Sequence, residues 1–487
     1  MTDPARTAAV VLAAGAGTRF GGGKLSATLG DRRVIDHVLD ALARVGLAET
    51  VVVVGPGPDA TSLRQGGARV VVNPRPQDGV SSSLRAGLAA LGPSVDAALI
   101  VLGDQPFVRP ATIRALLAVE VPVGRSLVVP RYAADGGSNP VLVLRAGWGL
   151  AAAIDGDRGL GLTIAANPEL VVEVTVSGSN PDIDTRGDLA AAAWAAQVRA
   201  NREQVDRVRE VGDGDFYAST SSLFVADPRR VDADDTTLAA LRGLVQPGER
   251  WLDIGAGAGR YALPIALAVG PAGEVVAVEA SASMLAGLRT GMADHGIANV
   301  RIVEGRWPAV AAEIPASSED GARASVDGAR PPVAGARPPV DAALIAHVGY
   351  DIEEIGPFLD AMEAASDRLC VAILMDRTPA AAAEAFWPLV HGEERIPLPA
   401  LDAFVGLLRA RGREPEVRIV ERSVRGYADR AAVLALLRRQ TWVEPDRARD
   451  LQLQAALDER LAPQPDGTVA IAGAPSLAIG LVTWRPR

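Results

Sequence analysis

The stretch AAVVLAAGAGTRFGGGK, residues 8–24, decides the fold of the first half of the chain. It opens with a short aliphatic run of the kind that forms a buried strand, and it then breaks into glycines before Arg19 and Lys24. Glycines lack a Cβ atom, so their backbone N–H groups can approach an anion closely, and the two cations offset negative charge. The stretch therefore predicts a phosphate-binding loop after a first strand, although a plain structural glycine turn explains the same residues.

Length and composition limit the class of protein. A chain of 487 residues predicts two or three domains, and its many aliphatic residues with only 4% aromatic residues favour doubly wound, Rossmann-like α/β domains. The formal net charge of -10, with no basic block, argues against a nucleic-acid partner. No run is long enough to cross a membrane, so we expect no membrane partner and a cytoplasmic location. Cys370 is the only cysteine and lies in an apolar run, which predicts a core residue and excludes a disulfide.

Carboxylates and serines follow the predicted strands of the first half. Aliphatic runs at 50–54, 69–72, 97–102 and 171–176 alternate with helical spacing, which predicts a doubly wound sheet. Asp104 comes just after the run 97–102, where a parallel strand ends at the ligand crevice, and a carboxylate there suits Mg²⁺. Asp184, after the run 171–176, is a second candidate. Ser82 begins a helix after Gly79, where its hydroxyl either caps the helix or holds a polar edge of a ligand.

These motifs, in this order, resemble a known family. LAAGAGTRFGGGKL, NPRPQDGVSSSLRAGL, GDQP, SNPVLV and DIDT together look like the molybdenum cofactor cytidylyltransferases, which are glycine-loop nucleotidyltransferases. The double alanine before Gly15 resembles the cytidylyl branch, and Ser138 replaces a glycine that relatives tend to carry. The resemblance implies catalytic residues Lys24, Arg19 and Asp104, Mg²⁺ ligands Asp104 and Asp184, and nucleotide-binding residues Leu12, Ala13, Ala14, Gly15, Gly17, Arg19, Lys24 and Ser82.

The resemblance also implies a reaction. A phosphate of a molybdopterin-type acceptor would attack the α-phosphorus of CTP, CMP would be transferred, and pyrophosphate would leave without a covalent enzyme intermediate. Molybdoenzyme maturation factors would be partners of such an enzyme. A transferase of the same fold that acts on a sugar phosphate or an isoprenoid precursor is the alternative.

A second glycine-rich stretch organises the other half of the chain. Residues 249–259, ERWLDIGAGAG, form a predicted strand followed by alternating glycines. About 20 residues later, the aliphatic run 274–279 ends in Glu279. Glycines that allow close approach, paired with an acid that can accept hydrogen bonds from ribose hydroxyls, are what a nucleoside needs at a first βα turn.

This half resembles the class I S-adenosylmethionine-dependent methyltransferases, which usually have an Asp two residues before the first glycine. The resemblance implies that Asp253, Gly255 and Gly257 border the methionine part of S-adenosylmethionine and that Glu279 binds its ribose. His347, at the end of the predicted strand 341–348, is a further candidate, or a polar residue that merely borders the fold. A non-catalytic module that binds S-adenosylmethionine or scaffolds partners is the alternative to an enzyme.

Three segments of the chain follow from these assignments. We expect a nucleotidyltransferase domain at 1–195, a helical linker at 196–233 and a methyltransferase-like domain at 234–487. Residues 316–339 interrupt the last domain with the repeat DGARPP…AGARPP. Their few apolar residues are too few to offset the ordering entropy, so we expect a disordered insertion.

Overall fold

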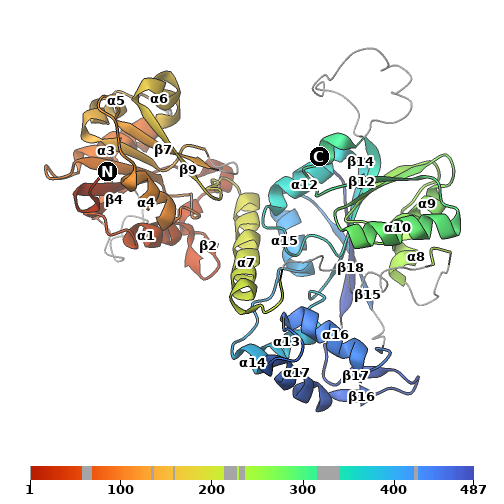
Figure 1. The fold of residues 1–487 in the computed structure, drawn as a ribbon. Coiled ribbons are helices and arrows are strands. Elements are labelled where there is room, and N and C mark those ends of the chain that lie inside the picture. The colour runs from red at the N-terminus through yellow and green to blue at the C-terminus, as the bar shows by residue number, and fades with distance from the viewer. Residues whose placement is uncertain are drawn as a thin grey trace. The chain divides into compact units, whose positions relative to one another are not determined.

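The computed structural model describes residues 2–56, 69–132, 137–156, 159–212, 227–229, 236–314, 339–421, 426–475 and 477–487. The chain divides into two compact units, Met1–Ala192 and Ala193–Arg487, and each is described by itself (Figure 1). The expected disordered insertion at 316–339 lies outside the described residues, apart from Pro339. No helix in the described part of the chain has both the length and the apolar character of a membrane span.

The first unit is built on a seven-stranded sheet with the order β5-β4-β1-β6-β8-β7-β9. Its strands are β1 (Thr7–Ala13), β4 (Glu49–Val54), β5 (Arg69–Val72), β6 (Ala97–Leu102), β7 (Leu127–Tyr132), β8 (Val141–Leu144) and β9 (Val171–Val176). β8 runs antiparallel to both β6 and β7, and the remaining pairs are parallel. The predicted α/β fold is confirmed, and the sheet is mixed because of this one reversed strand.

Helices cover both faces of this sheet, which explains why its central strands β1 and β6 are aliphatic almost throughout. The helices are α1 (Val34–Ala43), α3 (Val80–Ala89), α4 (Pro110–Ala118), α5 (Trp148–Ala152), α6 (Leu160–Ala166) and the start of α7 (Arg186–Val208). Along β1, Ala9 and Val11 belong to the core that contains the apolar face of α1. Val10, between them, belongs to the opposite core with Leu84 of α3. Alternate residues of a buried strand thus fill two different layers.

The second unit has a seven-stranded sheet with the order β12-β11-β10-β13-β14-β18-β15. Its strands are β10 (Arg250–Ile254), β11 (Glu274–Glu279), β12 (Val300–Glu304), β13 (Val340–Ala346), β14 (Ser366–Met375), β15 (Glu416–Glu421) and β18 (Ala478–Trp484). Its flanking helices are α8 (Thr236–Arg242), α9 (Ala262–Val269), α10 (Ala282–His295), α12 (Ile355–Ala365) and α15 (Leu401–Ala410). β18 is antiparallel to β14 and β15, so this sheet is also mixed. Cys370, in β14, is fully buried, as predicted.

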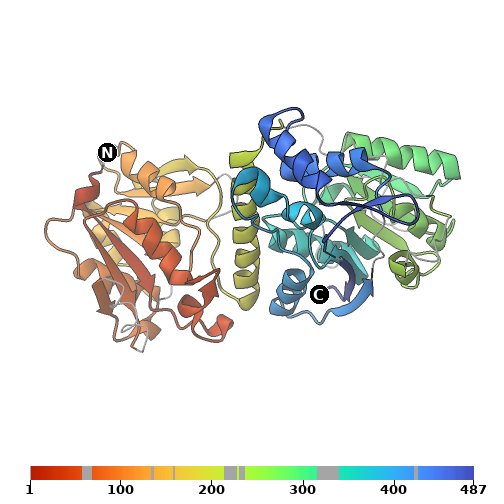
Figure 2. The same ribbon diagram turned by 90° about the horizontal axis from the view of Figure 1, so that it is seen from below.

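A helical lobe, which the sequence patterns did not predict, is inserted after β14 and after β15. It consists of α13 (Ala381–Glu384), α14 (Trp387–His391), α16 (Arg430–Thr441), α17 (Ala448–Asp458), β16 (Leu461–Pro463) and β17 (Val469–Ile471). Figures 1 and 2 show these elements gathered in one group beside the sheet. They enclose a hydrophobic cluster of their own, with Phe386, Leu437 and Leu453 at its centre. β14 and β15 both end beside the start of β18, so the lobe lies at the end of the sheet where these two strands finish.

Candidate functional site

The glycine loop after β1 is open on the side away from the sheet. Gly17, Gly21, Gly22 and Gly23 all adopt positive φ angles, 57°, 89°, 90° and 65°, which glycine alone adopts at little cost. A Cβ atom added at Gly15, Gly21, Gly22 or Gly23 would meet no atom within 4 Å. Gly21, Gly22 and Gly23 are therefore needed for the course of the backbone rather than for packing, and the N–H groups of Gly21 and Gly22 donate within the loop, to Thr18 O and Gly17 O.

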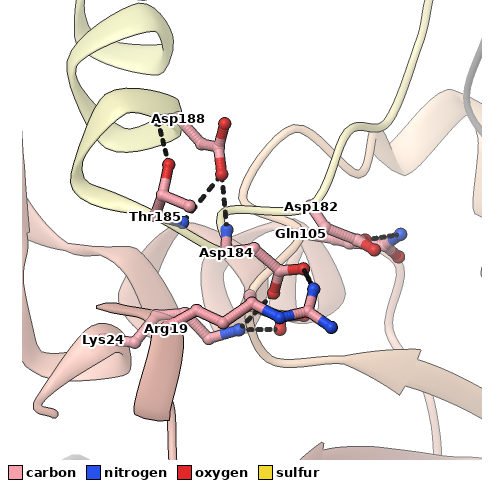
Figure 3. Close-up of polar contacts among 8 residues, drawn as sticks. Arg19, Lys24, Gln105, Asp182, Asp184, Thr185 and Asp188 are labelled. Atoms are coloured by element: carbon pink, nitrogen blue, oxygen red, sulfur yellow. Dashed lines mark hydrogen bonds and ion pairs between the residues drawn. The ribbon is translucent and has the colours of Figure 1, made fainter. Parts of the chain in front are cut away.

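The structure brings together four of the predicted site residues around the end of this loop. Lys24 Nζ donates to Asp104 Oδ2 at 2.6 Å and to Asp184 Oδ1 at 3.0 Å, and Arg19 Nη1 lies 3.2 Å from Asp184 Oδ2 (Figure 3). Burial alone would lower the pKa of Lys24, but its hydrogen bonds to both carboxylates outweigh burial and raise that pKa. The Lys24 ammonium thus holds together two acids that lie 80 residues apart in the sequence.

This arrangement fits a metal ion that is held partly by protein carboxylates and partly by the phosphate oxygens of a substrate. Asp104 and Asp184 supply carboxylate oxygens, and Mg²⁺ is usually held by one or two carboxylates with the rest of its ligands from water and substrate. Among the described residues, no group of three or more His, Cys, Asp or Glu side chains could hold a metal ion. The donor set therefore suits a metal that arrives with a nucleotide better than a metal caged by protein alone.

Three further polar residues, Gln105, Asp182 and Asp188, lie beside the carboxylates and were not predicted as site residues. Gln105 Nε2 donates to Asp182 Oδ1 at 2.6 Å, and burial raises the pKa of Asp182, with the negative charge of Asp104 adding to the shift. Asp188 Oδ2 accepts hydrogen bonds from the N–H groups of Asp184 and Thr185, and this fixes the turn before α7 (Figure 3). Asp182 lies two residues before Asp184 in the motif DIDT, and that spacing was the available signal.

The remaining predicted nucleotide-binding residues lie on both sides of the loop. Leu12 accepts a backbone hydrogen bond from Gly103 N at 3.0 Å, which ties the start of the loop to the end of β6. Ala13 ends β1, and Ala14 follows it. Ser82 Oγ donates to Gly79 O at 2.7 Å and accepts from Asn73 Nδ2 at 2.7 Å, so in this structure its hydroxyl serves the first turn of α3.

In the second unit, the structure brings Glu279 against the glycine turn after β10. Glu279 Oε2 accepts from Gly257 N at 2.8 Å, and Oε1 accepts from Ala280 N at 2.8 Å and Ser281 N at 2.7 Å. Gly255 has φ 72°, and a Cβ atom there would lie 2.5 Å from Val348 Cγ2. We refer to Gly255–Gly257 with Glu279 as the cradle of the second unit. Three backbone N–H groups therefore orient its carboxylate.

Two other predicted residues of this unit differ in their surroundings. Asp253 is 1% exposed, and its Oδ1 has no hydrogen-bond partner among the described residues. Burial raises the pKa of Asp253 to about 7, and the nearby charge of Glu279 adds to the shift. His347 follows β13 with φ 56°, an uncommon backbone conformation for a residue with a side chain, and its ring lies 6.3 Å from that of Tyr261. Tyr350 is buried, and its hydroxyl accepts from Met375 N.

Two family models match the chain. Residues 9–170 match the MobA-like NTP transferase domain, and residues 252–322 match a methyltransferase domain. The chain therefore carries a MobA-like NTP transferase domain followed by a methyltransferase domain, and the two resemblances that the motifs carry are confirmed at this level. The first match ends before Asp182 and Asp184, so it does not include the second carboxylate segment of the site.

Individual relatives cover only part of the chain. The phosphoenolpyruvate guanylyltransferase of Sanguibacter keddieii is 31% identical over 157 residues, which are 31% of this chain and 54% of that protein. The bifunctional protein GlmU of Corynebacterium aurimucosum is 37% identical over 126 residues, 24% of this chain and 26% of that protein. A crystal structure of the Mycobacterium sp. strain JC1 homologue of Mycobacterium tuberculosis Rv0371c is 28% identical, with a TM-score of 0.35. It covers 39% of this chain and 98% of that one.

Proposed function

We propose that the first unit transfers a nucleotidyl group from a nucleoside triphosphate to the phosphate of a small-molecule acceptor. One observation carries the proposal: Lys24 lies between Asp104 and Asp184, at 2.6 and 3.0 Å, beside an open glycine loop. Cations, carboxylates and free backbone N–H groups are the parts that nucleotidyl transfer needs, because this chemistry depends on positioning and charge neutralisation.

The residues would divide the work as follows. The glycine loop, Lys24 and Arg19 would bind the phosphates of the nucleotide, and Asp104 and Asp184 would hold Mg²⁺. The metal would supply neutralisation of the charge that develops on the leaving pyrophosphate. An oxygen of the acceptor phosphate forms a bond to the α-phosphorus, and the bond from that phosphorus to the bridging oxygen of pyrophosphate breaks. No residue of the chain has to form a covalent intermediate.

The acceptor is the finer part of the proposal. The double alanine Ala13-Ala14 favours CTP, and the motif order favours a molybdopterin-type acceptor. The curated relative that is 31% identical, in contrast, is named for phosphoenolpyruvate and a guanylyl group. We therefore favour a phosphorylated small molecule other than the molybdenum cofactor, which is the alternative that the sequence left open. Molybdenum cofactor and CTP remain in the test panel.

Asp104→Asn tests the assignment, with Asp96→Asn as its matched control. Asp96 precedes β6, at the opposite end of the strand that Asp104 follows, and forms an exposed ion pair with Arg6. Pyrophosphate release would be measured with CTP, GTP, ATP and UTP against phosphoenolpyruvate, sugar phosphates and molybdopterin. We expect Asp104→Asn to lower the rate by at least about a hundredfold, since loss of charge stabilisation at this site raises the barrier. Asp96→Asn should leave the rate within about twofold. A rate within about tenfold of wild type in Asp104→Asn would show that the metal assignment is wrong.

We infer further that the second unit binds S-adenosylmethionine in the cradle. The supporting observation is Glu279, whose carboxylate is held by three backbone N–H groups and retains acceptor capacity for ribose hydroxyls. Methyl transfer, and the acceptor of the methyl group, are further steps of this proposal. A module that binds S-adenosylmethionine without catalysis would use the same cradle.

Calorimetry on the full chain with S-adenosylmethionine tests this second assignment. We expect Glu279→Gln to weaken binding by about ten- to a hundredfold, because a hydrogen bond to a charged group is worth roughly 1.5–3 kcal/mol. Glu274→Gln, at the opposite end of β11, is the matched control and should bind as the wild type does. Absence of binding by the wild type would favour a scaffold, and binding indifferent to Glu279→Gln would mean that the ribose lies elsewhere.

A further inference from the structure

We propose that Arg109 binds a second anionic group of the acceptor, so that the acceptor carries a carboxylate or a further phosphate besides the phosphate that attacks. This inference rests on the proposed function of the first unit. It names the chemical class of the acceptor and a residue that selects it. Neither the motifs nor the family matches assign Arg109 to the site.

Arg109 lies against a glycine from another segment. It stands directly before α4, and its guanidinium packs on the backbone of Gly178, in the turn after β9. A Cβ atom at Gly178 would lie 2.9 Å from Arg109 Cζ and 3.0 and 3.1 Å from its terminal nitrogens. Gly178 also has φ +84°, so the turn favours glycine there, and the absence of a Cβ leaves room for the guanidinium. The guanidinium therefore lies against the turn after β9 without being held by an acid of the described residues.

The charge of Arg109 has no counter-ion in the part of the chain that the structure describes. Several other arginines of the first unit have polar partners: Arg6 pairs with Asp96 and Arg33 with Asp36, whereas Arg85 and Arg145 donate to backbone carbonyl oxygens. Within the described ranges, Arg109 forms no ion pair and donates no hydrogen bond, although a guanidinium carries five N–H donors. Its fork of donors matches a carboxylate or a phosphate better than any other group.

A continuous row of polar residues connects Arg109 with the carboxylates of the site. At one end, Asp182 is close enough to Asp104 for the negative charge of Asp104 to help raise its pKa. Gln105 then bridges Asp182 and Asn180: its Nε2 donates to Asp182 Oδ1 at 2.6 Å, and its Oε1 accepts from Asn180 Nδ2 at 3.1 Å. Gln105 is 3% and Asn180 is 1% exposed, so they form a fixed polar floor.

The row continues from Asn180 to Arg109. Asn180 Nδ2 lies 3.4 Å from the carbonyl oxygen of Asn139, which also accepts from the Tyr132 hydroxyl at 2.9 Å. Arg109 lies against Gly178, two residues before Asn180 in the same loop, and its positive charge opposes the rise to about 12 that burial causes in the pKa of Tyr132. Arg109 thus ends a row that begins at the proposed metal ligands and belongs to the same site.

The charges along the row give the acceptor an orientation. Asp104, Asp182 and Asp184 make the first end acidic, with Lys24 bonded to two of them. A free carboxylate of the acceptor would be repelled there, whereas its phosphate can share the metal that offsets those acids. At the other end, Arg109 attracts the second anionic group. An acceptor with two separated negative groups therefore lies along the row with its phosphate toward Asp104.

A matched pair of probes tests the inference on the full chain. 3-Phosphoglycerate and glycerol 3-phosphate share a phosphorylated three-carbon skeleton, but the first has a carboxylate where the second has a hydroxymethyl group. Their Kd values would be measured by calorimetry with Mg²⁺ and non-hydrolysable analogues of CTP and GTP. We expect the wild type to prefer 3-phosphoglycerate by about ten- to a hundredfold, which is the effect of one charge-assisted hydrogen-bonded pair. Arg109→Met should abolish this preference and leave the Kd of the nucleotide unchanged, and Arg109→Lys should keep part of it.

Arg114→Met is the control for a lost positive charge on the same helix. Arg114 lies in α4, and its exposed side chain donates to the backbone oxygen of Arg44. This variant should keep the full preference. If nucleotide binds but the wild type does not prefer 3-phosphoglycerate, or if the preference survives in Arg109→Met, the inference is overturned. If the wild type binds no nucleotide, the proposed function fails, and the inference fails with it.

Discussion

The two glycine loops of the chain follow the same kind of buried strand, yet their surroundings are opposite. In the first unit, a Cβ atom at Gly21 or Gly22 would meet nothing within 4 Å. In the second, a Cβ atom at Gly259 would lie 2.7 Å from Leu288 and 2.8 Å from Leu263, both core residues. The first loop thus leaves the space beside its glycines open, whereas Gly259 lets the second loop pack closely against α9 and α10. Similar glycine-rich sequences can therefore leave a loop open in one domain and allow close packing in another.

The carboxylates beside the two loops differ in a parallel way. Asp104 and Asp184 are held by the side chains of Lys24 and Arg19, which are long and can turn to other partners. Glu279 is held by backbone N–H groups, which stay where they are. A ligand of the first site therefore has to exchange ion pairs, while a ligand of the second enters a cradle that is already formed.

The largest expected contrast concerns the buried acid of the second loop. Asp253 has a pKa of about 7 against an ordinary value of 3.8. As the pH rises from about 4 to 7, the unfolded chain ionises this carboxyl first, so the free energy of unfolding of the second unit falls. At roughly 1.4 kcal/mol per pH unit, the loss amounts to at most about 4 kcal/mol. Urea unfolding between pH 5 and 8 should show this decline in the wild type and a smaller one in Asp253→Asn. Equal slopes in both proteins would mean that Asp253 is ionised in the fold.

A pair of alanine substitutions measures the difference in packing between the loops. Gly22 and Gly259 have nearly equal φ angles, 90° and 89°, so both variants carry the same backbone cost of about 1–2 kcal/mol. Gly259→Ala adds overpacking against Leu263 and Leu288, worth about 1–3 kcal/mol more. Chemical unfolding of the full chain should therefore show a larger loss in the second unit for Gly259→Ala than in the first unit for Gly22→Ala. Equal losses would remove the distinction between an open loop and a packed one.

The smallest expected effect tests the exchange of ion pairs in the first site. Lys24→Met removes the ammonium that lies between Asp104 and Asp184, so these carboxylates should bind Mn²⁺ more tightly in the absence of nucleotide, by about tenfold. Electron paramagnetic resonance of free Mn²⁺ measures this binding without any turnover. Arg19→Met is the control, since the Arg19 side chain is 79% exposed and its ion pair with Asp184 is longer, at 3.2 Å, so its effect should be smaller. Unchanged Mn²⁺ affinity in Lys24→Met would show that Lys24 does not occupy the place of the metal.

Patterns local to the chain predicted the parts of the fold that local physics determines. Buried parallel strands are aliphatic on both faces, so β1, β6, β10 and β11 could be recognised from runs of residues alone. The reversed direction of β8 could not, because Val141–Leu144 has the same aliphatic composition as the strands of this sheet that pair in parallel. Glu416–Glu421 forms an edge strand in which Val417 and Ile419 are 37% and 55% exposed, so the alternation of polar and apolar residues does not predict its buried face.

The residues of the candidate site also fall into those with a local sequence signal and those without one. Lys24, Asp104 and Asp184 could be predicted because each follows a strand end or a glycine loop, positions where ligands bind. Arg109 has no such local signal. Its importance depends on Gly178 and Tyr132, which the sheet brings beside it from β9 and β7. Arg109 can be recognised only in the folded structure, because the signal is its neighbours in space and its lack of a counter-ion among the described residues.

The residues of the helical lobe of the second unit can change during evolution independently of the cradle. Its hydrophobic cluster shares no residue with the cluster beneath the sheet. The free-energy effects of mutations at sites without common partners add independently. We therefore expect mutations in the lobe to have almost no effect on the free energy of ligand binding in the cradle. Selection can therefore alter the surface that the lobe presents, residue by residue, while Glu279 and its glycine turn are inherited unchanged. A lineage that needs a new partner for this domain can acquire it there.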